Sequence, residues 1–155
     1  MNIFVLDYNQ ERCAQYHCDK HVVKMILEYA QILSTNVRLT SELDVGYRVT
    51  HRNHPCTIWA RESLSNWLWL KELARQLNIE YRYRYKNIYN HKSYDVIESL
   101  PIPNIDDVGL TAFPQAMPDY CKVEDAVDAY RLYYIREKSS IASWTKRNAP
   151  DWYLY

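Results

Sequence analysis

The sequence has very little glycine. Its 155 residues include two glycines, Gly46 and Gly109, which lie far apart in the chain. Phosphate-binding loops of the P-loop and dinucleotide-binding types need several glycines within one short segment. The G-x-S-x-G motif of the α/β-hydrolases is missing as well. Catalysis or nucleotide binding organised around a glycine-rich loop is therefore excluded.

The sequence also lacks a net charge, a long apolar run and closely spaced cysteines. Its 19 Lys and Arg residues balance its 19 Asp and Glu residues, so any contact with nucleic acid must come from a local basic patch. No apolar run approaches the roughly 20 residues of a transmembrane helix, and no signal-peptide pattern is visible. The cysteines include no C-x-x-C pair. We expect a cytoplasmic protein with reduced thiols and no membrane association, in an oligomeric state that the sequence leaves open.

Aromatic and aliphatic residues are abundant, with 48% hydrophobic residues, 15 Tyr and 5 Trp. This composition excludes general disorder, and the length suits one hydrophobic core. After Pro55 the chain contains neither proline nor glycine as far as Leu100, and its apolar residues follow helical spacing. Tyr81 to Lys86 (YRYRYK) could form a strand, but we expect it to end a helix. We therefore predict a mainly α, compact single domain over residues 1–155, with a short extended segment at Asn2–Leu6.

The most informative stretch runs from His17 to Thr35. On a helix, six of its polar residues fall on one narrow stripe: His17, His21, Lys24, Glu28, Gln31 and Thr35. Most other positions are apolar, which reverses the proportions of an ordinary surface helix. The pattern predicts a helix that ends near Arg38, is buried nearly all round and carries one functional seam. The alternative is a solvated stripe containing a Lys24–Glu28 ion pair.

A second polar stretch, residues 50–56, reads THRNHPC. Pro55 suits the first turn of a new helix, with Asn53 or His54 as its cap. Free backbone N–H groups at a helix start bind anions. The candidate ligands for a phosphate or carboxylate here are His51, Arg52 and His54. The alternative is a capping loop with two surface histidines.

Positive charge gathers between Glu80 and Asp95, where the chain has no other acidic residue. The cations in this interval are Arg82, Arg84, Lys86 and Lys92. Basic residues interleaved with aromatic ones suit a nucleic-acid backbone with stacked bases. The same pattern also occurs where arginines extend over a tyrosine-rich core.

The amine of Met1 is a further candidate group. If the Asn2–Leu6 segment is buried, the amine is held near the seam. An α-amino group is less basic than a lysine side chain, which makes it the stronger nucleophile at neutral pH. The alternative is a frayed terminus, which is common.

Three kinds of chemistry fit the seam. In the first, Glu28 and His21 perform acid–base or electrostatic work beside an amine nucleophile. In the second, the seam and the arginines form a non-catalytic pocket for a phosphorylated small molecule.

The third kind of chemistry uses a metal ion. The H-x-x-x-H spacing of His17 and His21 places two imidazoles on one helix face, which suits metal ligation. The further candidate ligands are Glu28, His51 and His54, with Cys18 or Cys56. Lys24 opposes this interpretation because a cation among the ligands repels the metal. We expect no metal or other cofactor, and a divalent metal is the less favoured alternative.

Several segments resemble known proteins. CDKHVVKMILEYAQ, THRNHPC, and FPQAMPDYC to AYRLYYIREK are together similar to a group of small proteins encoded by phages and large DNA viruses, a resemblance that implies no particular activity. The DKH-x6-E motif, Asp19 to Glu28, resembles the pyrimidine-dimer DNA glycosylases of phage endonuclease V type. That resemblance implies a compact all-α enzyme whose N-terminal amine attacks the sugar of a damaged nucleoside. By the same resemblance, Glu28 is the assisting glutamate on the first long helix and His21 is the histidine two turns earlier.

We therefore predict a viral DNA-processing enzyme of the base-excision, DNA glycosylase/lyase-like type. The expected catalytic residues are Glu28, His21, Lys24 and Met1. The expected substrate-binding residues are His17, Gln31, His51, Arg52, His54, Arg82, Arg84, Lys86 and Lys92. The alternatives are a non-catalytic protein that sequesters a nucleotide or nucleotide-like small molecule, and a metal-dependent nucleotide hydrolase.

Overall fold

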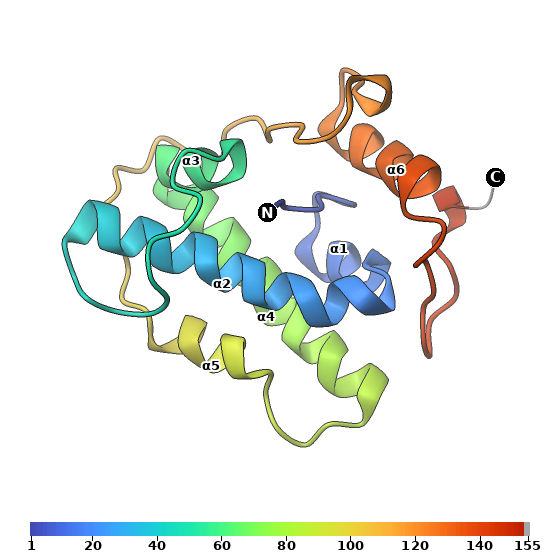
Figure 1. Ribbon diagram of the computed structural model, residues 1–155, viewed down its shortest axis with the longest axis horizontal. Helices are drawn as coiled ribbons and strands as arrows, with labels where there is room; N and C mark the ends of the chain where they lie inside the picture. The colour runs from blue at the N-terminus through green and yellow to red at the C-terminus, as the bar shows by residue number, and fades with distance from the viewer. Residues whose placement is uncertain (154–155) are drawn as a thin grey trace.

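The computed structural model describes residues 1–153, and every regular element in that range is helical. The α-helices are α1 (Gln10–Tyr16), α2 (Asp19–Ser41), α3 (Pro55–Glu62), α4 (Leu64–Tyr85), α5 (Lys92–Ser99) and α6 (Ala126–Glu137) (Figure 1). Two short 3-10 helices, η1 (Asp119–Cys121) and η2 (Asp151–Tyr153), complete the set. The predicted mainly α fold is confirmed. Within residues 1–153, no helix has the length and apolarity needed to cross a membrane.

Local capping explains where two of the helices begin. The Asn9 side chain accepts a hydrogen bond from the backbone N–H of Arg12 at the start of α1. The His54 ring accepts one from the N–H of Cys56, and Pro55 occupies the first turn of α3. Proline suits that position because the first turn leaves its N–H groups without helical partners. The predicted helix start at Pro55, capped by His54, is therefore confirmed.

The proline-free stretch after Pro55 forms three helices, α3, α4 and α5, and Ser63 separates the first two. Ser63 has extended backbone angles. Its hydroxyl donates to the carboxylate of Asp107 and accepts from the N–H of Val108. These contacts with residues 107–108 hold Ser63 in its extended conformation between the two helices. The YRYRYK segment ends α4 at Tyr85, as predicted.

Helix α2 is the centre of the packing. It contacts α3, α4 and α5, and Figure 1 shows it crossing in front of α4. The helix runs three residues past the predicted end, to Ser41, and begins at Asp19, so His17 lies just before it. Val23 and Leu27 are each 39% exposed. The prediction of a helix buried nearly all round is therefore wrong along this edge.

The non-helical segment before α1 is inserted between α2 and α6 (Figure 1). Residues 2–6 are all buried. The N–H of Phe4 donates to the hydroxyl of Tyr29 on α2. On the other side, the hydroxyl of Tyr130 on α6 donates to the amide oxygen of Asn2. These contacts fix the direction in which the chain approaches Met1.

A buried ion-pair network fastens α4 to the start of α2. The Arg84 guanidinium pairs with Glu80 at 2.9 Å and with Asp19 at 3.1 Å. Arg147, from the segment after α6, pairs with Glu80 at 2.6 Å. Asp19 also accepts hydrogen bonds from the backbone N–H and the hydroxyl of Thr145. Removing one partner from such a network leaves a buried charge uncompensated, which destabilises the fold. We therefore infer that this network stabilises the folded protein.

Candidate active site

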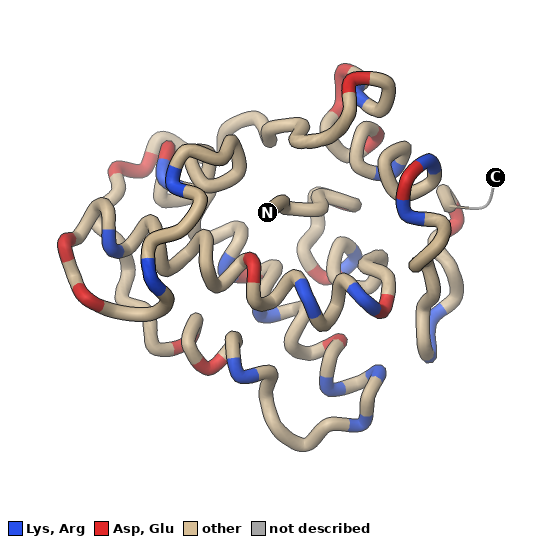
Figure 2. The backbone as a smooth tube through the Cα atoms, in the orientation of Figure 1, with Lys and Arg blue, Asp and Glu red and all other residues tan. Residues whose placement is uncertain are grey.

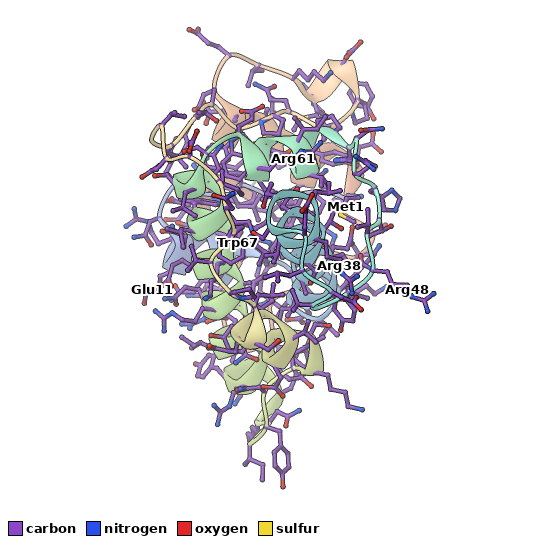
Figure 3. All side chains as sticks on the ribbon, turned by 90° about the vertical axis from the view of Figure 1, so that its left-hand side faces the viewer. Met1, Glu11, Arg38, Arg48, Arg61 and Trp67 are labelled. Atoms are coloured by element: carbon purple, nitrogen blue, oxygen red, sulfur yellow. The ribbon has the colours of Figure 1, made fainter. Side chains whose placement is uncertain are left out.

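The amine of Met1 and the carboxylate of Glu28 form an ion pair. The amine nitrogen lies 3.0 Å from Oε1 of Glu28, and Nζ of Lys24 lies 3.9 Å from Oε2. The Glu28 side chain is 12% exposed, whereas that of Lys24 is 71% exposed. Figure 3, which looks along α2 from its C-terminal end, labels Met1 beside this helix. One half-buried carboxylate thus faces an amine on one side and a lysine on the other.

These groups line a pocket of about 150 Å³. Its walls are formed by Met1, Asn2, Phe4, His21, Lys24, Met25, Glu28, Tyr133 and Lys138. The structure therefore brings together all of the predicted catalytic residues, Met1, His21, Lys24 and Glu28. A nucleophilic amine, a carboxylate and an imidazole in one small pocket can support attack on an electrophilic carbon with proton transfer.

His21 is a neutral member of this pocket. It is 5% exposed, and its ring stacks on Phe4 with the centroids 4.3 Å apart. Nδ1 lies 2.6 Å from the hydroxyl of Tyr134. Burial, followed by the positive charges of neighbouring groups that include Lys138, lowers the pKa of His21 to about 3. The imidazole is therefore uncharged at neutral pH and contributes through hydrogen bonding.

His17 does not reach the pocket. Its ring is fully buried, with Nδ1 donating to the carbonyl of Cys13 at 2.7 Å and Nε2 lying 3.0 Å from the hydroxyl of Tyr29. Burial lowers the pKa of His17 to about 4. The prediction that His17 binds substrate is wrong, because both ring nitrogens are used inside the core. Its contact with Tyr29 instead supports the residue that holds Phe4.

The THRNHPC loop packs beside the seam of α2. The Thr35 hydroxyl donates to the carbonyl of Thr50 and accepts from the N–H of the same residue. Desolvation, and then the charge of the Met1 amine, lowers the pKa of His54. His54 is therefore close enough to the Met1 amine to interact with it electrostatically. Its Nδ1 accepts the hydrogen bond that caps α3.

The other predicted binding residues around this loop are placed less deeply. His51 and Arg52 are exposed, and Gln31 is half-buried on the turn after Glu28. The backbone carbonyl of Arg52 accepts from the Arg61 guanidinium, which anchors the loop to α3. His51 adopts a positive φ of 46°, a conformation that is uncommon for residues other than glycine.

The predicted basic patch is only partly accessible. Arg84 is 2% exposed because it belongs to the buried ion network, so its assignment to substrate binding is wrong. Arg82 is exposed but directs its guanidinium back to the carbonyl of Ile88 at 3.1 Å. Lys86 and Lys92 are exposed. Figure 2 shows basic positions both along α2 and around the loop between α4 and α5.

Lys138 and Tyr133 form the far wall of the pocket and were not predicted as site residues. Nζ of Lys138 lies 4.8 Å from the ring centroid of Tyr133 and 5.9 Å from that of Phe4. Both residues come from α6 and its C-terminal cap. The only sequence signal was their place in the AYRLYYIREK segment, since nothing local indicates that α6 packs over the seam.

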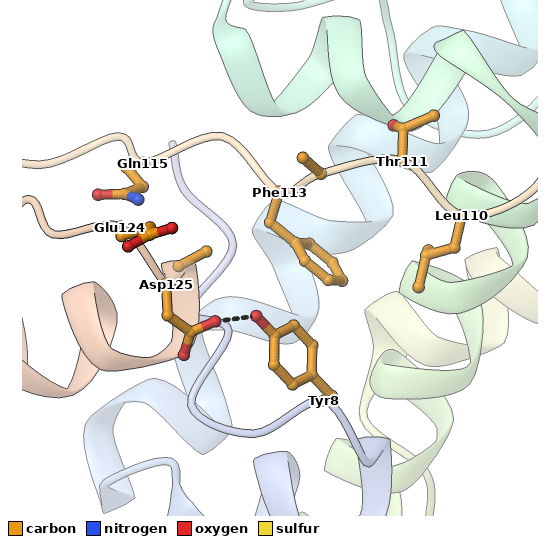
Figure 4. A pocket seen from close by; sticks show the side chains of 9 residues that line it. Tyr8, Leu110, Thr111, Phe113, Gln115, Glu124 and Asp125 are labelled. Atoms are coloured by element: carbon orange, nitrogen blue, oxygen red, sulfur yellow. Dashed lines mark hydrogen bonds between the residues drawn. The ribbon is translucent and has the colours of Figure 1, made fainter.

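A larger pocket of about 280 Å³ lies where residues 110–115 meet the start of α6 (Figure 4). The Tyr8 hydroxyl donates to the carboxylate of Asp125, and this hydrogen bond raises the pKa of Tyr8 to about 12. Glu124 and Asp125 line this pocket. Two acidic residues without a compensating cation in the lining oppose the binding of a phosphate group.

A protein metal site needs several converging ligands. Among residues 1–153, no group of three His, Cys, Asp or Glu side chains is placed to hold a metal ion. The ligand set considered for the metal interpretation is therefore not assembled. In particular, His17 is enclosed in the core and His51 is exposed on a loop.

Comparison with known proteins gives one match. The model of a family described as pyrimidine dimer DNA glycosylase matches residues 1–93. No curated protein and no solved structure matches the chain. The matched range includes Met1, His21, Lys24 and Glu28, and it ends before α6.

Proposed function

The chain belongs to the pyrimidine dimer DNA glycosylase family, and we propose on this basis that it excises damaged bases from DNA through the amine of Met1, assisted by Glu28. The observation that carries the proposal is the 3.0 Å separation of the Met1 amine from Oε1 of Glu28. A nucleophile and a proton acceptor at hydrogen-bond distance are the minimum requirement for this kind of covalent catalysis.

The proposed reaction begins with proton transfer from the Met1 ammonium group to Glu28. The amine nitrogen then bonds to C1′ of the damaged nucleotide, and the glycosidic bond breaks with its electron pair on the departing base. Opening of the C1′–O4′ bond leaves an imine between Met1 and the sugar. The neutral amine loses two protons as the imine forms. One is transferred to the departing base and the other to O4′. Glu28 acts as the relay for these transfers.

The cations around the pocket suit a nucleic-acid substrate. Lys24 extends into solvent at one side of Glu28, and Lys138 lies across the pocket. Lysines so placed can neutralise the phosphates beside the attacked sugar. His21, held neutral, is positioned to exchange a hydrogen bond with the sugar or the leaving base without adding charge. We include the exposed Lys86 and Lys92 as more distant phosphate contacts.

Pocket size favours DNA over a sequestered small molecule. Sites that enclose small ligands typically measure about 300–1,000 Å³. The pocket beside Met1 measures about 150 Å³ and cannot surround a whole nucleotide. A single sugar presented from the edge of a duplex needs much less enclosed space. We therefore propose that the substrate is duplex DNA. We also propose that the protein acts in the cell interior and has a phage or large-DNA-virus origin.

Base release and strand cleavage on ultraviolet-irradiated duplex DNA test the proposal. The parent protein should act on irradiated DNA and leave unirradiated DNA intact. Glu28→Gln should lose this activity, whereas Glu11→Gln, which alters a glutamate exposed on α1, should keep it. A parent protein that leaves irradiated duplex DNA unchanged would overturn the proposed function.

A further inference from the structure

The loop between α4 and α5 carries the two most exposed large apolar side chains among residues 1–153. Ile88 is 74% exposed and Tyr89 is 73% exposed. The two residues are adjacent within the loop between α4 and α5, which extends away from the helices (Figure 1). Neither side chain contributes to the core, so their exposure has an unfavourable hydration free energy without a packing gain.

The loop is held in this shape by its own side chains. The Arg82 guanidinium donates to the carbonyls of Asn87 and Ile88. The amide of Asn87 donates to the hydroxyl of Tyr81 and accepts from the N–H of Tyr89. A backbone fixed at both ends presents the two apolar residues to solvent in a set direction. This preorganisation lowers the entropy cost of inserting them into a partner.

The charge around the tip indicates the chemistry of that partner. Lys86 and Lys92 flank the loop and are exposed, and the chain has no acidic residue between Glu80 and Asp95. An apolar tip between two lysines complements a polyanion with an apolar interior. Duplex DNA has this character, with stacked bases inside and phosphates outside.

One edge of α2 connects the loop with the proposed active site. Nδ1 of His91 accepts from the N–H of Ser93. Burial lowers the pKa of His91, and the backbone of Val23 on α2 lies close enough to the ring to oppose this shift. Val23 precedes Lys24 on the exposed edge of α2 and lies five residues before Glu28. At about 1.5 Å per residue, this is roughly 7.5 Å along the helix axis. Leu27 and Lys24 lie between Val23 and Glu28 around the helix and are exposed, so a duplex laid along this edge of α2 can contact both places.

We propose that Ile88 and Tyr89 form a wedge that enters between neighbouring base pairs of duplex DNA, with Lys86 and Lys92 on the adjacent phosphates. Apolar and aromatic side chains that enter a base step unstack it and kink the duplex, and an aromatic ring recovers part of the lost stacking. The wedge opens the duplex beside the nucleotide that the pocket receives. The inference rests on the proposed function for its choice of duplex DNA.

The test uses a duplex containing 2-aminopurine, whose fluorescence rises when the base is unstacked. The Ile88→Ser/Tyr89→Ser variant is compared with the parent, and with Val108→Ser as a control. Val108 is similarly exposed, at 70%, but it lies far from the loop. Its N–H donates to the hydroxyl of Ser63, which is the N-cap residue of α4. The wedge variant should lose the fluorescence rise and bind duplex about tenfold more weakly, within the range for lost base stacking. On a duplex with a preformed bulge it should bind as the parent does.

Two outcomes overturn the wedge. One is an unchanged fluorescence rise and affinity in the double variant. The other is a change in self-association, or in binding to a protein, without a change in DNA binding, which would make the tip a protein interface. Both readouts measure binding without turnover, so they can be made in a Glu28→Gln background. Failure of the proposed catalysis is therefore distinguishable from failure of the wedge.

Discussion

The amine of Met1 lies 3.0 Å from Oε1 of Glu28, although one residue begins the chain and the other lies in the middle of α2. The contact depends on the buried segment 2–6, which is fixed by Tyr29 on one side and by Tyr130 on the other. An amine held in this way is preorganised for attack, because its orientation is set before a substrate arrives.

Replacing Glu28 with glutamine should remove turnover and preserve the fold. The amide has nearly the same shape as the carboxylate but cannot accept the amine proton. We expect the single-turnover rate of base release to fall by at least about 100-fold, the usual contribution of general acid–base catalysis. Thermal unfolding should shift little. Full turnover in Glu28→Gln would assign the Met1–Glu28–Lys24 contacts to structure alone.

Replacing Arg84 with alanine should destabilise the protein without an intrinsic effect on DNA binding. Loss of one partner from a buried ion pair costs about 3–5 kcal/mol in the free energy of unfolding. The matched control is Arg75→Ala, which breaks an exposed pair with Glu72 and should cost about 0–1 kcal/mol. Urea denaturation compares the two variants. If Arg84→Ala unfolds at the same urea concentration as the parent but binds DNA more weakly, the structural role is wrong and Arg84 contributes to DNA binding.

Arg84 and His17 illustrate what the sequence could not reveal. Helix spacing and capping are local properties, so α2, the Pro55 helix start and the helical YRYRYK segment were predictable. The burial of a charged residue depends on partners such as Glu80 and Asp19, which reach it only through tertiary packing. Lys138 was missed for the same reason, because its place beside Met1 depends on how α6 packs. The shared face of His21 and Glu28 was predictable from helical periodicity, whereas the place of Met1 beside them depends on the packing of residues 2–6.

Acid should destabilise the fold through its buried histidines. Burial lowers the pKa of His17 to about 4 and that of His21 to about 3. Between about pH 4 and 6.5 the unfolded chain therefore binds protons that the folded chain excludes, and stability rises with pH across this interval. From pH 6.5 to 5 the loss should be about 1–2 kcal/mol per histidine.

Urea denaturation at pH 7 and pH 5 measures this effect in the parent and in His17→Gln. Glutamine can donate to Cys13 and accept from Tyr29 without titrating, so the variant should lose less stability at pH 5. The exposed His51 supplies the control, because His51→Gln should behave as the parent does. Equal losses in the parent and in His17→Gln would show that His17 is not a source of the acid sensitivity.

Neutralising Lys86 and Lys92 together should weaken the salt dependence of DNA binding. Each lost phosphate contact lowers the slope of log affinity against log salt by about 1, so the double alanine variant should lose about 2. Lys122→Ala/Arg136→Ala makes the same charge change around η1 and α6 and should leave the slope unaltered. If the parent and the Lys86/Lys92 variant show equal slopes of log affinity against log salt, the loop between α4 and α5 does not contact DNA.

Borohydride trapping on damaged duplex DNA tests the central claim most directly. Reduction converts an imine between Met1 and the sugar into a stable covalent adduct, and peptide mapping then identifies the attached residue. The account predicts an adduct at Met1 in the parent, much less in Glu28→Gln, and none when the amine is acetylated or extended. The absence of an adduct in the parent across several lesion types, or an adduct that maps to a lysine, would contradict it.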